Sequence, residues 1–288
     1  MENKNLYLIL LILGTAFWGI SFPVTKLSIG HFSQSTFLFY RFVLATISVA
    51  IIFSKHLKSI DKLAIKAGVS LAIPLTFAIY FQTLGLVKHT SASQCAFVAG
   101  MCVVIIPFIK TIFYKTKIEI KIWLAAILAL LGLFIITING HLVINIGDAY
   151  VLFGAIGFAY YLIKVEQYAG RKNIIPTLVP MFATAALIML ILSLFDGSSD
   201  WTPQNHKFWI GIIYCALFST AYMYSVSNIS QKYISSEKVA IIYLFDPIFA
   251  AIAAFFILNE SLDGRLLCGG SLILMATIIT EIKFKKMH

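Results

Sequence analysis

Charged residues are scarce in this chain of 288 residues. Asp, Glu, Lys and Arg make up 12% of it and apolar residues 60%, with a mean hydropathy of +0.92, whereas a soluble domain is about half apolar and a quarter charged. This shortage of charge excludes a cytosolic enzyme, a secreted disulfide-stabilised domain and a disordered protein. It indicates a protein that resides in a membrane.

Cysteine, histidine and the common catalytic motifs are also scarce. The four cysteines, Cys95, Cys102, Cys215 and Cys268, lie inside apolar runs without a C-x-x-C pair, so we interpret them as packing residues. All six histidines fall in predicted loops or tails, which excludes a histidine proton relay within the membrane. The sequence has no G-x-x-x-x-G-K-[ST], H-E-x-x-H or G-x-S-x-G motif. We therefore expect no metal, no cofactor and no enzymatic activity.

Ten long apolar runs account for most of the chain. A membrane-spanning helix needs roughly 20 residues, and an open strand cannot satisfy its backbone groups in lipid. The sequence therefore predicts an all-α membrane protein with ten transmembrane helices and no room for a soluble domain. The predicted spans are 6–27, 34–53, 67–87, 91–114, 120–138, 148–168, 176–195, 208–229, 236–258 and 264–282.

The net charge of +10 is distributed unevenly between the two sides of these spans. With the N-terminus inside, the even-numbered gaps and both tails hold most of the Lys and Arg, whereas the other gaps hold Lys88, Lys207 and Arg265. Cytoplasmic loops of membrane proteins carry such an excess. The distribution predicts a multi-pass protein of the cytoplasmic (inner) membrane with both termini in the cytoplasm. It explains the basic charge by the lipid bilayer, without nucleic acid as a partner.

The chain contains a weak internal repeat. A shift of 140 residues superposes the first five predicted helices on the last five and places Pro107 on Pro247. We expect two units, 1–140 and 141–288. Because five is odd, the second unit enters the membrane from the opposite side, which gives the inverted repeat typical of secondary transporters.

Several motifs resemble those of EamA-type permeases of the drug/metabolite transporter superfamily, in order and spacing along nearly the whole chain. They are Phe17–Lys26, Tyr40-Arg41-Phe42, Thr90–Ser93 with Ala96-Phe97-Val98 and Pro107, and, in the second half, Asp246–Ala250 and Leu258–Leu262. The sequence departs from the family where Lys115–Glu119 and Asn259-Glu260 replace Gly-Glu pairs. The resemblance implies a ten-helix carrier with a central substrate cavity between the halves, and the family is rich in exporters.

Ionisable residues within spans are costly and usually face a cavity or a partner. Lys26 lies on one face with Trp18 and Phe22, so it either contacts a substrate carboxylate beside these two aromatic walls or extends to the outer interface. For Arg41 a structural contact is favoured over direct substrate contact. For Asp246 we favour function over a structural role, as a clamp for a substrate amine, a proton site or a partner of Arg41 or Lys26.

Two further ionisable residues, Lys110 and Glu166, are weaker candidates. Lys110 can extend to the cytoplasm, and Glu166 lies close to Lys164, where a solvated pair is the simpler interpretation and a gate the alternative. Polar groups in mid-span complete the predicted substrate site, and prolines in spans 4 and 9 are the predicted hinges. The polar groups are Tyr80, Gln82, Gln94, Tyr160, Tyr222 and Tyr243, and the hinges Pro107 and Pro247.

These observations predict a secondary transporter of small organic metabolites such as amino acids, working by alternating access, with export favoured. The alternative is a carrier of anionic nucleotide-like or cofactor-like metabolites, whose anionic groups would bind to Lys26, Arg41 and Lys110. An intramembrane enzyme or a channel is an alternative of another class. Spans 120–138 and 264–282 have almost no polar residue in mid-span. We expect them at the periphery or at a subunit contact, which leaves a homodimer open.

Overall fold

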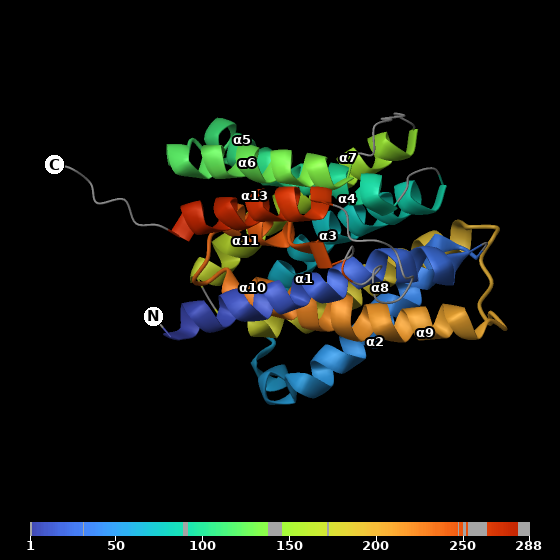
Figure 1. Cartoon of the computed structure of the whole chain (residues 1–288). Helices are drawn as coiled ribbons and strands as arrows, with labels where there is room; N and C mark the ends of the chain where they lie inside the picture. Colours follow the sequence, from blue (N-terminus) through green and yellow to red (C-terminus); the bar gives the residue numbers. More distant parts are fainter. Residues whose placement is uncertain are drawn as a thin grey trace.

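The computed structural model describes residues 2–30, 32–88, 92–137, 146–171, 173–246, 248–249, 252 and 264–281, and within these ranges the regular elements are all helices (Figure 1). Seven spans are long and apolar enough to cross a membrane, and Ile120–Ile135 and Leu267–Thr280 are shorter apolar helices. The all-helical fold thus agrees with the sequence prediction.

The helices follow the predicted spans closely along the first eight. The elements are α1 (Glu2–Ile29), α2 (Gln34–Ile52), η1 (Ser54–Ser59), α3 (Lys62–Lys88), α4 (Ala92–Gly100), α5 (Cys102–Ile112), α6 (Ile120–Thr137), α7 (Ile146–Arg171), α8 (Ile175–Phe195), α9 (His206–Tyr214), η2 (Cys215–Tyr222), α10 (Met223–Ser230), α11 (Ser236–Tyr243) and α13 (Gly264–Glu281).

Two of the first eight predicted spans are interrupted near their middles. The fourth is divided at Met101 into α4 and α5. The eighth changes from α-helix to π-helix over η2 and back to α-helix in α10. Such interruptions within a span are found where backbone lines a cavity or packs against protein.

The helices pack in pairs that join the two halves of the chain. The pairs are α2 with α8, α3 with α7, α6 with α13, and α1 with α9, η2 and α10. Glycine permits the close approach of α3 and α7, because a Cβ atom on Gly154 would lie 2.9 Å from the carbonyl oxygen of Ala78. The apolar helices α6 and α13, expected at the periphery, lie against each other along one side of the bundle (Figure 1).

The two ends of the helix bundle are stabilised by different contacts, ring stacking at one end and hydrogen bonds to a loop at the other. At the end where α1 begins and α13 ends, here the terminal face (left in Figure 1), Tyr7 stacks on Tyr233 at 5.4 Å between ring centroids. At the opposite end, the loop face, residues 196–205 are tied to α2. Ser33 donates a 2.7 Å hydrogen bond to the Asp196 carboxylate, and the Tyr40 hydroxyl donates one of 2.6 Å to the Trp201 carbonyl oxygen.

Candidate functional site

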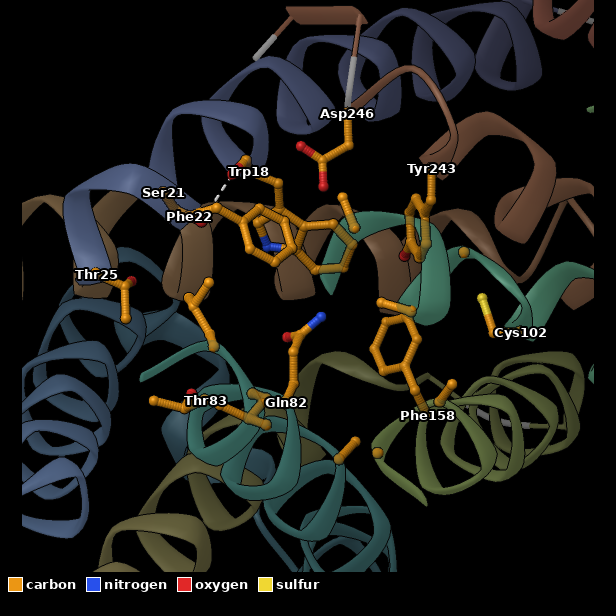
Figure 2. A pocket seen from close by; sticks show the side chains of 18 of the residues that line it. Trp18, Ser21, Phe22, Thr25, Gln82, Thr83, Cys102, Phe158, Tyr243 and Asp246 are labelled. Atoms are coloured by element: carbon orange, nitrogen blue, oxygen red, sulfur yellow. Dashed lines mark hydrogen bonds between the residues drawn. The ribbon is translucent and has the colours of Figure 1, made fainter. Parts of the chain in front are cut away.

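A cavity of about 90 Å³ lies in the middle of the bundle, between helices of both halves (Figure 2). That volume exceeds several-fold the roughly 10–15 Å³ that one water needs on the same measure. The polar and aromatic side chains that line it are Trp18, Ser21, Phe22 and Thr25 of α1, Arg41 of α2, Gln82 and Thr83 of α3, Cys102 of α5, Phe158 of α7, Tyr224 of α10, and Tyr243 and Asp246 at the end of α11 and beyond.

Asp246 is the lining carboxylate, and it is 8% exposed. Its Oδ1 has no hydrogen-bond partner among the described residues. The chain leaves the α11 helix in a turn at Leu244–Phe245, and the carboxylate of Asp246 then points into the cavity opposite the Gln82 amide (Figure 2). A buried carboxylate oxygen without a hydrogen-bond partner is costly. Its position indicates that something polar or cationic, from solvent or a solute, meets it there.

Arg41 brings the opposite charge to the same cavity. It is 6% exposed and donates from Nε to the Thr220 hydroxyl at 2.6 Å and from Nη2 to the Ser219 hydroxyl at 3.0 Å. Both partners are neutral, and no ion pair in the described part of the chain involves Arg41. The guanidinium is thus held in place while its charge stays available to an anionic group.

The π-helix η2 provides the surface on which these groups dock. Trp18 Nε1 donates a 2.7 Å hydrogen bond to the Ser219 carbonyl oxygen, next to the hydroxyls that hold Arg41. π-helical segments are rare and frequent at functional sites. Here η2 connects α1 and α2 of the first half to the second half at the level of the cavity.

Aromatic rings form the remaining wall around Trp18. The ring centroids of Tyr243, Tyr224 and Phe158 lie 4.8, 5.5 and 5.8 Å from that of Trp18, in edge-on or tilted arrangements. Behind the wall, the Tyr243 hydroxyl donates to the Ser227 hydroxyl. The cavity therefore combines an apolar aromatic side with one cationic and one anionic group, which is a suitable lining for a small amphipathic solute.

Two stretches of the chain, residues 5–138 and 145–282, match the profile described as the EamA-like transporter family. The chain belongs to the EamA-like transporter family. It is similar to an uncharacterized transporter of Archaeoglobus fulgidus, with 28% identity over 281 residues that cover 97% of this chain and 87% of the relative. It is also similar to the uncharacterized transporter YyaM of Bacillus subtilis, with 24% identity over 267 residues that cover 88% and 87% of the two chains.

A solved crystal structure has the same fold, with a TM-score of 0.76 and 12% identity, and the match covers 98% of this chain and 97% of the other. The family and the relatives indicate an integral membrane protein that acts as a transporter. This agrees with the resemblance seen in the sequence motifs.

The cavity of this EamA-like transporter brings together six of the residues predicted for substrate binding. They are Trp18, Phe22, Arg41, Gln82, Tyr243 and Asp246. Arg41 docks on two hydroxyls and also lines the cavity, so both the structural contact and the substrate contact stay open for it.

Four other predicted residues do not line the cavity. Tyr160 is 40% exposed and lies under the Lys164 ammonium at 5.1 Å, and the Tyr222 hydroxyl donates to the Leu10 carbonyl oxygen at 3.2 Å. Tyr80 packs edge-on against Phe81. Lys26 is exposed and is not among the lining residues.

Helix phase explains most of these differences. Phe158 and Tyr160, and likewise Tyr222 and Tyr224, are two residues apart, so on a regular helix they point about 200° apart. Phe158 and Tyr224 therefore face the cavity in place of Tyr160 and Tyr222. Gly154 precedes Phe158 by one turn and also lines the cavity. This small residue on the same helix face was the feature of the sequence that could have indicated that Phe158 faces the cavity.

The hinges at Pro107 and Pro247 stay predictions. Pro107 lies within α5, which continues through it, and the break in this span falls instead at Met101, beside the cavity-lining Cys102. Pro247 and the side chain of Gln94 lie outside the part of the chain that the structure describes.

The predicted pair of Glu166 with Lys164 is wrong. Glu166 Oε2 accepts a 2.5 Å hydrogen bond from Lys110 Nζ, and Lys164 Nζ donates instead to the Ser70 hydroxyl at 2.6 Å. Residues 164 and 166 are two apart on α7 and thus face about 200° apart. Neither Lys110 nor Glu166 lines the cavity.

Proposed function

We propose that this chain is a secondary transporter that exports small organic metabolites such as amino acids by alternating access through the central cavity. The observation that carries this proposal is that Arg41 and Asp246 line the same cavity, each more than nine-tenths buried. An amino acid brings a carboxylate for the guanidinium and an ammonium for the Asp246 carboxylate. Its side chain would contact the aromatic wall of Trp18, Phe158 and Tyr224.

The energetic argument favours a zwitterion over an ion of one sign. A buried charge is costly until it meets an opposite charge or water. The two groups come from opposite halves, Arg41 from α2 and Asp246 from the segment after α11. A solute bearing both charges would therefore bridge the halves.

The helix pairing supports our proposal of ten transmembrane helices in two inverted five-helix units, 1–140 and 141–288. Under an exchange of the halves, the pairs α2–α8 and α6–α13 map onto themselves. The pair α3–α7 maps onto the pairing of α1 with α9, η2 and α10. All of these contacts are observed. An inverted-repeat carrier needs such symmetric contacts, because each half takes up the conformation of the other when the cavity opens to the opposite side.

The alternative of an anionic, nucleotide-like substrate has less support. Of the three cations it would use, Arg41 lines the cavity, whereas Lys26 and Lys110 do not. Lys110 already contacts two carboxylates, Glu166 and Glu237. Asp246 would also repel a polyanion in the same cavity.

We place the terminal face on the cytoplasmic side because the lysine-rich connections of the chain lie there. Lys55, Lys58, Lys62 and Lys66, around η1, are all exposed. Positive charge is retained on the cytoplasmic side of membranes. Export then means passage from the terminal face to the loop face.

The test combines ligand screening with transport. A thermal-shift screen of the purified protein against amino acids, their amines and acids, and nucleotides should show stabilisation by zwitterionic amino acids, since a ligand of the folded state raises its stability by mass action. The best solute should then show saturable uptake in liposomes. Stabilisation by nucleotides alone would favour the anion carrier. Ohmic current or chemical turnover without uptake would reject the transporter.

A further inference from the structure

Three ionisable side chains outside the cavity, those of Lys110, Glu166 and Glu237, meet near the terminal face. Together with Ser236, which donates to Glu166, they form the Lys110 cluster. Lys110 Nζ lies 2.5 Å from Glu166 Oε2 and 2.8 Å from Glu237 Oε1. Ser236 donates to the same Glu166 oxygen from its hydroxyl at 2.7 Å and from its backbone N–H at 3.3 Å. One ammonium and one helix end thus share a single carboxylate oxygen.

The cluster joins the two halves of the molecule. Lys110 belongs to the last turn of α5 in the first half, Glu166 to α7 and Glu237 to the first turn of α11 in the second half. The side chains of Lys110 and Glu237 are 11% and 5% exposed. Removing one partner from a pair so buried leaves an uncompensated charge, so the contact is held firmly only while all its members are present.

A second ion pair lies within the first half and does not join it to the second. Lys121 and Glu119 lie 2.9 Å apart and two positions apart in sequence, and their side chains are 17% and 71% exposed. Such a surface pair contributes little. It serves as a matched comparison for the Lys110 cluster.

Helix α11 connects the Lys110 cluster to the cavity. Its first turn carries Ser236 and Glu237, and it ends at Tyr243, which lines the cavity about 9 Å further along the helix axis at 1.5 Å per residue. The N-cap residue Ser235 makes no side-chain capping bond. Glu166 of α7 supplies the acceptor for the Ser236 N–H instead, so the start of α11 is capped from a different helix.

A turn separates the C-terminal end of α11 from the residues that follow it. The turn at Leu244–Phe245 ends the helix, and Asp246 comes directly after it with its carboxylate in the cavity. This two-turn helix therefore carries two members of the Lys110 cluster at one end and the cavity-lining Tyr243 at the other. A displacement of Tyr243 by a solute would be transmitted along the helix to Glu237.

We propose that the Lys110 cluster is the gate that closes the cavity toward the terminal face, and that α11 couples the gate to occupancy of the cavity. This inference rests on the transport function proposed above. Opening separates Glu237 on α11 from Lys110 on α5, and water then enters between these helices as far as Cys102, which lies at the start of α5 and lines the cavity.

The native Cys102 provides the probe. In full-length protein with Cys95, Cys215 and Cys268 replaced by alanine, a membrane-impermeant, positively charged methanethiosulfonate reagent is added to each side of oriented membrane vesicles in turn. We expect slow labelling of the parent protein from the terminal face. The substitution Lys110→Met should raise the rate by about tenfold, because it shifts the population toward the open form, and the matched Lys121→Met should not.

Two further variants keep the test independent of folding failures. Glu237→Gln breaks the same contact without leaving an unpaired carboxylate, so it should also speed labelling from the terminal face. Lys110→Arg, which keeps a cation beside Glu166 and Glu237, should label at close to the parent rate. The gate is rejected if Glu237→Gln, with an unchanged gel-filtration profile, labels at the parent rate, or if labelling rises equally from both faces.

Coupling through α11 is tested by a double-mutant cycle on the labelling rate. Tyr243→Phe removes the hydroxyl that reaches Ser227 at the cavity end of α11. If α11 moves as a unit, the effects of Tyr243→Phe and Glu237→Gln on the rate are not multiplicative. Multiplicative effects would reject the coupling. None of these measurements uses a solute, so a failed gate and a failed substrate assignment are distinguishable.

Discussion

Trp18 of α1 donates its indole N–H to the backbone carbonyl of Ser219 in η2, across 201 positions of the chain, at 2.7 Å. The same serine accepts from Arg41 through its hydroxyl. The wall of the cavity and its cation are therefore fixed to one residue of the π-helix. Changes at this point should alter both stability and binding.

Replacement of Trp18 by Phe tests the indole contact. The variant keeps an aromatic wall but loses the hydrogen bond to Ser219, which should cost about 1 kcal/mol of unfolding free energy and weaken solute binding. The matched control is Trp209→Phe, whose indole N–H binds the Pro203 carbonyl oxygen at the loop face at 2.9 Å. It should lower thermal stability to a similar extent and leave solute affinity unchanged. Equal losses of affinity in both variants would contradict a cavity role for Trp18.

The substitution Asp246→Asn should separate binding from stability. It removes a buried charge whose Oδ1 has no partner among the described residues, so the melting temperature of the ligand-free protein should stay the same or rise. The Kd for amino acids should increase by at least about tenfold, which is 1.4 kcal/mol. Isothermal titration and thermal shift measure the two effects, and the exposed Asp200→Asn is the control. Unchanged Kd would exclude Asp246 as the ammonium site.

Arg41→Lys should affect carboxylate recognition selectively. Lysine keeps the charge but cannot donate simultaneously to Thr220 and Ser219 in the geometry of a guanidinium. We expect weaker binding of amino acids, with little change for the corresponding amines that lack a carboxylate. If amines and amino acids lose affinity equally, the guanidinium has only a structural role. Competition binding on the purified variant distinguishes the two results.

The contact between α3 and α7 should not tolerate a larger residue at Gly154. A Cβ atom there would lie 2.9 Å from the Ala78 carbonyl oxygen, a backbone atom that cannot move aside locally. Gly154→Ala should therefore destabilise the protein by about 1–3 kcal/mol. Gly170→Ala near the end of the same helix meets nothing within 4 Å, and should be neutral or stabilising. Thermal unfolding in detergent compares the pair.

The loop face should lose stability in acid. Partial burial raises the pKa of Asp196, but hydrogen bonds from Ser198, Ser33 and Ser35 outweigh it and hold this pKa below its ordinary value of 3.8. The folded state thus favours the charged form. Its contribution is complete above the unfolded pKa and is lost as the pH falls through the lower folded pKa.

Asp196→Asn should therefore lower the melting temperature at neutral pH, and the difference from the parent should shrink below about pH 4. A scan of melting temperature from about pH 3 to pH 7 measures it. A difference that stays constant through this range would show that the Asp196 charge does not contribute.

The sequence predicted the membrane class, the bounds of the first eight spans and several residues of the cavity lining, because each follows from local composition. Runs such as 34–53 and 176–195 differ from α2 and α8 by no more than one residue at either end. Asp246 and Arg41 were found because ionisable groups are rare inside spans and each needs a partner there.

Contacts between distant residues were harder to predict. Nothing local indicates that Lys110 meets Glu237 or that Glu166 caps α11, since both depend on how α5, α7 and α11 cross. The phase of a helix also decides whether Tyr222 or Tyr224 faces the cavity, and the π-helix η2 changes that phase in a way the pattern of apolar residues does not reveal.

That π-helix has a further consequence for a carrier built from two halves. By the 140-residue shift, the counterpart of the span formed by α9, η2 and α10 is α3, which is an uninterrupted α-helix from Lys62 to Lys88. If the two halves exchange shapes as proposed above, this difference gives the forms open to either side unequal free energies. The empty carrier would then be populated mainly in the form open to one side of the membrane, and dilute solute would bind first from that side.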